Sequence, residues 1–143
     1  MQIRDLLLIK GDAVEVIGPD ATLDEVARHL TRCGIGALVV SRGDGAVDGI
    51  VSERDVVREV AAEGAGALSR TVADVMTTPV TTCALDDEVT SLMATMTEQR
   101  VRHLPVVSEG RLVGIVSIGD VVKSRVDQLE RDRKELLEYV SGR

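Results

Sequence analysis

The sequence has almost no aromatic side chains. Its 143 residues include a single tyrosine, Tyr139, and neither phenylalanine nor tryptophan. A flat ligand bound to this chain must therefore rest between aliphatic side chains and backbone, because there is almost nothing aromatic to stack on.

Cysteines, cationic runs and long apolar runs are also scarce. Cys33 and Cys83 are too few for a disulfide framework and do not form a C-x-x-C pair, which predicts reduced thiols and a cytoplasmic protein. No apolar run approaches the roughly 18 to 20 residues of a membrane span, and no signal-peptide pattern opens the chain, so we expect no membrane partner. The net charge of -7, without a Lys/Arg run, argues against nucleic acid as a partner.

What the sequence does contain is an internal repeat, the feature to look for first. Residues 49–57, GIVSERDVV, align at an offset of 65 with residues 114–122, GIVSIGDVV, and differ at two positions. Upstream, residues 35–40 align at an offset of 66 with residues 101–106. The change of offset falls in the turn at 42–45, where an extra residue is well tolerated.

Both halves predict the order strand, helix, strand, strand, helix. The expected first-half elements are a strand at 14–17, a helix from a Thr22–Glu25 capping box to Gly34, strands at 37–40 and 47–51, and a helix from Ser52 to about Gly64. In the second half they are strands at 80–83, 104–107 and 112–116, with a helix before this hairpin and another opening at Ser117. The fold class is therefore α+β.

A unit of about 60 residues buries too little surface to be stable alone, so we expect the two repeats to pack together with pseudo-twofold symmetry. The Gly-Ala-Gly-Ala stretch at 64–67 predicts the break between them. The expected division is a first repeat at 1–66, a linker at 67–72, a second repeat at 73–125 and a C-terminal helical extension at 126–143.

This order of elements, with HLPVV at 103–107 and G-I-V-S-x-x-D closing each half, resembles the cystathionine-β-synthase (CBS) domain. The resemblance covers nearly the whole chain and is to the stand-alone bacterial or archaeal tandem pair, the Bateman module. It implies a regulatory, signal-transducing homodimer that binds AMP, ADP, ATP, NAD or S-adenosylmethionine in clefts between its repeats and acts on an effector protein. The sequence does not choose among these ligands.

The resemblance also implies which residues bind. Asp55 and Asp120 would accept both hydrogens of a ribose diol, and Ser52 and Ser117, at helix starts, would steady ribose or phosphate. The other expected contacts are Lys10, Gly36, Ala37, Ile50, Arg54, Thr78, Pro79, Val80, Arg102, His103 and Ile115. The cationic ones do not recur at equivalent positions of the two repeats, so we expect clefts of unequal affinity, with pH-dependent binding through His103.

Two observations leave other readings open. Ser-x-x-Asp at a helix start can be a cap and nothing more, in which case the protein is a dimerisation scaffold with vestigial clefts. His29 and Cys33, four residues apart on one helix, could pair as base and nucleophile, but no orienting group or oxyanion element accompanies them. We therefore expect no enzyme, no catalytic cofactor and, from the Cys/His spacing, no metal site.

The C-terminal stretch at 119–140 predicts a helix with apolar residues at spacings of four and three. This apolar stripe suits either a dimerisation or docking helix, or a helix that folds back on its own module. Its members are Val122, Val126, Leu129, Leu136 and Val140.

Overall fold

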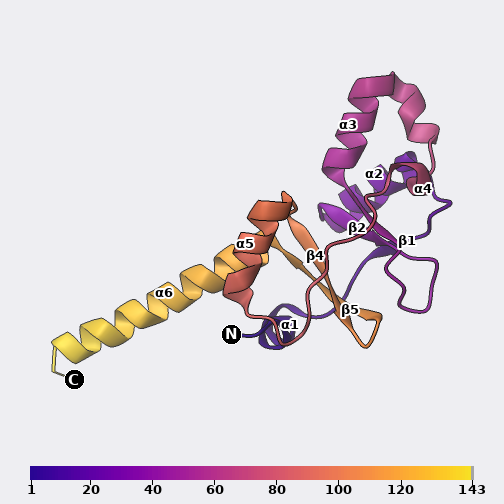
Figure 1. Ribbon diagram of the computed structural model, residues 1–143. Helices are drawn as coiled ribbons and strands as arrows, with labels where there is room; N and C mark the ends of the chain where they lie inside the picture. Colours follow the sequence, from indigo (N-terminus) through magenta and orange to yellow (C-terminus); the bar gives the residue numbers. More distant parts are fainter. Residues whose placement is uncertain (143) are drawn as a thin grey trace.

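The computed structural model describes residues 1–142 as two α+β repeats side by side, with one long helix extending away from them (Figure 1). Both repeats carry an antiparallel hairpin with a helix before it and a helix after it, which confirms the fold class expected from the sequence. In chain order the elements are α1 (Ile3–Lys10), β1 (Val16–Ile17), α2 (Leu23–Cys33), β2 (Ala37–Val40), β3 (Gly49–Ser52), α3 (Glu53–Glu63), the 3-10 helix η1 (Gly64–Ser69), α4 (Val72–Val75), α5 (Val89–Gln99), β4 (His103–Ser108), β5 (Arg111–Ser117) and α6 (Ile118–Val140).

The two sheets have related topologies. In the first sheet β1 runs parallel to β2, with Ile17 beside Val40, and β2 pairs antiparallel with β3. In the second, β4 and β5 form the hairpin, and Cys83 makes one parallel bridge to Val106. The strand expected at 80–83 is thus reduced to this bridge at its last residue, Cys83, and a turn closed by Asp87 follows directly.

The cores of the two repeats do not follow chain order. Helix α1, which the sequence analysis did not anticipate, packs Ile3, Leu6 and Leu7 into the core of the second repeat. Helix α4 packs Val72 and Val75 into the core of the first repeat. The short helix that precedes each repeat therefore completes the core of the other one.

Glycines at equivalent positions of the two repeats leave room for α1 and for the end of α4, the segments that cross into the other repeat. A Cβ atom at Gly114, on β5, would lie 2.8 Å from a methyl carbon of Leu7 in α1. At Gly49, on β3, it would lie 2.5 Å from the sulfur of Met76, which follows α4. The glycine that opens each G-I-V-S motif is therefore explained by the close approach of the crossing segment.

The linker region is ordered and packed. Helix η1 begins at the expected break, and both Ala67 and Val72, at the ends of the expected linker, are fully buried. The division at 66 and the linker at 67–72 remain predictions.

Helix α6 extends beyond the two repeats and does not fold back on them, because residues 125–142 are all exposed. Within residues 1–142, no helix combines the length and hydropathy needed to cross a bilayer.

Helix α2 has the ends expected from its sequence, apart from half of the N-terminal motif. The Thr22 hydroxyl accepts a hydrogen bond from the Glu25 amide at 3.3 Å, without the reciprocal bond of a full capping box. Gly34 ends the helix in the left-handed region at φ 64°. At the equivalent end of α5 stands Arg100, at φ 54°, where a side chain is strained.

This difference predicts opposite effects on stability at the two helix ends. Arg100→Gly should stabilise the protein by about 0.5–1 kcal/mol, because relief of left-handed strain exceeds the entropy that glycine adds to the unfolded chain. Gly34→Ala should destabilise it by about 1 kcal/mol, and no atom lies within 4 Å of the new Cβ, so only backbone conformation changes. Urea midpoints with unchanged m-values measure both; a loss of stability in Arg100→Gly would contradict the expectation.

Candidate functional site: two carboxylates at strand-to-helix turns

Asp55 lies at the turn from β3 into α3. We call this turn and the side chains that contact Asp55 the Asp55 site. Its Oδ2 accepts hydrogen bonds from the Ser52 amide (2.8 Å) and hydroxyl (3.1 Å), and the Asp55 amide donates to the Ser52 hydroxyl at 3.3 Å. This is a full capping box at the start of α3. The other carboxylate oxygen is 3.0 Å from the Arg58 guanidinium, and the Asp55 side chain is only 8% exposed.

Asp120 lies at the equivalent turn from β5 into α6, which we call the Asp120 site. It makes the same capping box with Ser117, and its Oδ2 is also 2.8 Å from the Lys10 ammonium group. Lys10 donates a second hydrogen bond, of 2.6 Å, to the Ile115 carbonyl on β5. Lys10 ends α1, so the crossing of that helix into the second repeat delivers the cation to this carboxylate.

The two carboxylates differ in whether an oxygen atom remains available to accept another hydrogen bond. Partial burial alone raises the pKa of Asp120, but hydrogen bonds from Lys10 and Ser117 outweigh it and hold that pKa below its ordinary value. Asp120 is therefore ionised at neutral pH. Its Oδ1 accepts no hydrogen bond from residues 1–142, whereas both oxygens of Asp55 are engaged.

His103, at the start of β4, lies where the two repeats contact each other. A Cβ atom at Gly36 would lie 3.3 Å from its ring and 3.4 Å from a carboxylate oxygen of Glu53, so these first-repeat residues adjoin the second-repeat imidazole. Burial lowers the pKa of His103, and the charges of Lys10 and Arg102 add to this effect against those of Glu53 and Asp120. The ring is therefore neutral at neutral pH.

Backbone hydrogen bonds position the other residues that were expected to contact a ligand. Ile50 and Thr77 exchange amide-to-carbonyl hydrogen bonds of 3.1 and 2.9 Å, so Thr78, Pro79 and Val80 follow directly from the edge of β3. At equivalent places in the repeats, the Glu53 amide donates to the Gly36 carbonyl (2.9 Å) and the Ile118 amide to the Arg102 carbonyl (2.8 Å). Ala37 pairs with Ser52, and His103 pairs with Ser117.

Comparison with known proteins identifies the fold. A sequence profile of the CBS domain matches residues 4–62 and 72–127. The chain belongs to the CBS domain family. The CBS-domain containing protein ATU1752 from Agrobacterium tumefaciens is 46% identical, with a TM-score of 0.85 over 87% of this chain and 99% of that one. The mitochondrial CBS domain-containing protein CBSX3 from Arabidopsis thaliana is 34% identical over 98% of this chain and 72% of its own length.

Both CBS repeats use their Ser-x-x-Asp motif as a helix cap, which is the simpler of the two readings of the sequence. In both caps the bonded carboxylate oxygen is Oδ2. Arg58 pairs with the remaining oxygen of Asp55, whereas Oδ1 of Asp120 accepts no hydrogen bond from residues 1–142. Arg54, expected to offer a cation in the first CBS repeat, is exposed, and Arg58 pairs with Asp55 instead. Arg58 and Glu53 were missed, although the i,i+3 spacing of Asp55 and Arg58 was available as a signal for one of them.

Proposed function

We propose that this chain is a regulatory module that binds an adenine nucleotide, AMP, ADP, ATP or NAD, between its CBS repeats and catalyses nothing itself. The observation that carries the proposal is the convergence of Lys10, Asp120 and His103, from three separate segments, where β5 meets α6. Asp120 Oδ1 would accept from the ribose diol, and Lys10 would move from Asp120 to a phosphate oxygen. Ile115 would supply an aliphatic surface for the base.

Two further points support a nucleoside ligand. The start of α6 presents backbone amides and the positive end of a helix dipole near Asp120, which favours phosphate oxygens. A CBS domain pair solved in complex with 5′-methylthioadenosine and S-adenosyl-L-methionine shares this fold at a TM-score of 0.79 and 22% identity. The two sites of this chain would differ, with the Asp120 site binding first because Arg58 and near-complete burial close off Asp55.

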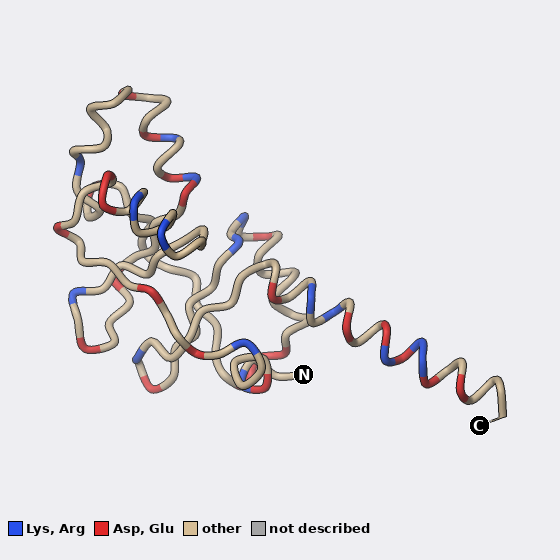
Figure 2. Tube along the Cα trace, turned by 180° about the vertical axis from the view of Figure 1, so that it is seen from behind, with Lys and Arg blue, Asp and Glu red and all other residues tan. Residues whose placement is uncertain are grey.

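The partner of the module would be a second copy of the chain, with an unidentified effector protein receiving the signal. Apolar side chains of α3 and α6 are exposed, among them Val57, Val60, Val122, Val126 and Leu129. Figure 2 shows cationic and anionic residues interleaved along α6, a pattern that can complement itself in a pair of helices. A hexameric CBS-CP12 protein with a TM-score of 0.74 and 25% identity is an oligomeric relative. The free thiols suit the cytoplasm.

The alternative function is a homodimerisation scaffold with vestigial clefts. The specific observation in its favour is that both motif carboxylates already serve as caps in the free protein. A scaffold would dimerise without binding nucleotide, so ligand binding separates the two functions.

Thermal unfolding of the purified chain with AMP, ADP, ATP, NAD or S-adenosylmethionine tests the proposal. One ligand at about 100 times its dissociation constant should add roughly 2.7 kcal/mol to the native state and raise the midpoint by several degrees. Asp120→Asn, whose amide oxygen can still cap α6, should abolish the rise, and Asp55→Asn should leave most of it. If no ligand raises the midpoint at millimolar concentration, the scaffold function replaces the sensor.

A further inference from the structure

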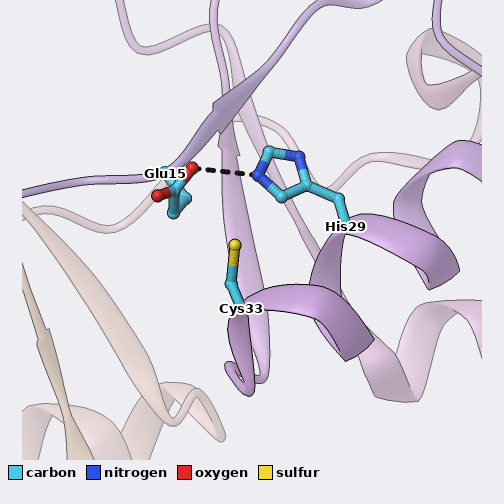
Figure 3. A group of neighbouring side chains, drawn as sticks. All are labelled: Glu15, His29 and Cys33. Atoms are coloured by element: carbon cyan, nitrogen blue, oxygen red, sulfur yellow. Dashed lines mark hydrogen bonds and ion pairs between the residues drawn. The ribbon is translucent and has the colours of Figure 1, made fainter.

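Three potential metal ligands of different chemistry converge in the first repeat, and none of them belongs to either carboxylate site. Glu15, His29 and Cys33 each offer one ligand atom, and these atoms lie within 4.8 Å of one another. Figure 3 shows the side chains of His29 and Cys33 extending from α2 toward Glu15, which precedes β1. Glu15 Oε2 is 2.9 Å from His29 Nε2.

Rigid elements hold this trio. His29 and Cys33 are four residues apart on α2 and so share one face of the helix. Glu15 is fixed by its carbonyl, which accepts from the Val39 amide at 3.3 Å, and by the parallel pairing of β1 with β2 that follows. The absence of a metal site was expected from linear Cys/His spacing, and the third ligand comes instead from the register of the sheet.

We propose that Glu15, His29 and Cys33 bind one Zn²⁺ ion. A thiolate, an imidazole nitrogen and a carboxylate oxygen are the ligand types zinc takes, and three protein ligands plus water complete its tetrahedron. Zinc bonds of 2.0–2.3 Å set ligand atoms about 3.3–3.5 Å apart, so Glu15 and His29 separate slightly and Cys33 rotates inward. The exposed Cys33 side chain has room to do so.

Binding needs no oxidant or reductant. The Cys33 thiol releases its proton to solvent as the Zn–S bond forms, and His29 binds through Nε2 as neutral imidazole with its proton on Nδ1. The Glu15–His29 hydrogen bond is replaced by two bonds to the ion. Zinc would also tie Glu15 to α2 and so anchor the segment between β1 and Lys10. The zinc site does not depend on nucleotide binding.

Cobalt absorption and zinc titration of the full chain test the site. Co²⁺ should give a thiolate-to-metal absorption band, and calorimetry should give one Zn²⁺ per chain. Removing the outer-shell partner of a zinc ligand costs about 10–100-fold in affinity, so Cys33→Ser, which removes a ligand, should weaken Zn²⁺ binding by about 100-fold or more and abolish the band. His103→Gln, the matched control at the other histidine, should leave both unchanged.

Thiol alkylation gives a second readout that does not depend on absorption. Cys83 is 7% exposed, and burial, with a smaller contribution from Asp87, raises the pKa of its thiol to about 12, so the folded chain should react at Cys33 alone. Zn²⁺ should protect Cys33 in the wild type and not in Glu15→Gln. Zinc binding as tight in Cys33→Ser as in the wild type, or no protection of Cys33 at saturating Zn²⁺, would overturn the assignment.

Discussion

Replacing Ile3 with alanine should destabilise the whole protein by about 2–5 kcal/mol, a large part of the stability of a chain of this size. Ile3 is fully buried in the core of the second repeat, among side chains of α5, β4, β5 and α6. Alanine would lose the transfer free energy of the buried carbons and leave a cavity that the sheet cannot close. Urea unfolding followed by circular dichroism measures the loss.

The same helix supplies the control. Ile9 is 72% exposed, so Ile9→Ala should change stability by no more than about 0.5 kcal/mol. The two substitutions share the change in helix propensity, and their difference isolates the contribution of packing. Equal effects would show that α1 does not dock on the second repeat.

Replacing Lys10 with methionine should separate AMP from adenosine. The ammonium group now bridges Asp120 and the Ile115 carbonyl, and in the proposed complex it would contact a phosphate. Its loss removes a charge-assisted hydrogen bond, so AMP should bind about tenfold more weakly or worse. Adenosine has no phosphate for Lys10 to contact, and its ribose would use Asp120 Oδ1 and not the Oδ2 atom that pairs with Lys10, so adenosine should bind about as well as before. Calorimetry with both ligands measures the ratio.

Lys134→Met, the same substitution on the exposed part of α6, is the matched control and should alter neither affinity. A structural role for Lys10 would weaken AMP and adenosine equally, through distortion of the turn. Such an equal loss would contradict the assignment of Lys10 to phosphate.

The repeat made the hairpins and helix starts predictable, because each depends on local chemistry. The Ser52 and Ser117 caps, the Gly34 helix end and the apolar hairpin strands follow from short-range patterns that occur twice or carry a strong conformational preference. The family resemblance then supplied the candidate carboxylates. The resemblance could not show that in the free protein Asp55 is paired with Arg58 and Asp120 with Lys10.

The missed features depend on contacts between distant parts of the chain. Helix α1 has only eight residues, and although Ile3, Leu6 and Leu7 follow helical spacing, the core they enter is formed about 80–120 positions later. The zinc trio was missed for a related reason. Pairing of β1 with β2 decides which side chain faces His29 and Cys33, and spacing along the chain does not show it.

The exchange of short helices between the two cores has a consequence for synthesis of the chain on the ribosome. Helix α1 is made about 110 residues before Gly114, on the strand that receives it, so at 5–20 residues per second it waits roughly 5–20 s for its docking surface. During that interval Ile3, Leu6 and Leu7 have no core to enter. A nascent chain stalled before β5 would therefore present an unsatisfied apolar helix, the kind of surface that chaperones bind and that leads to aggregation.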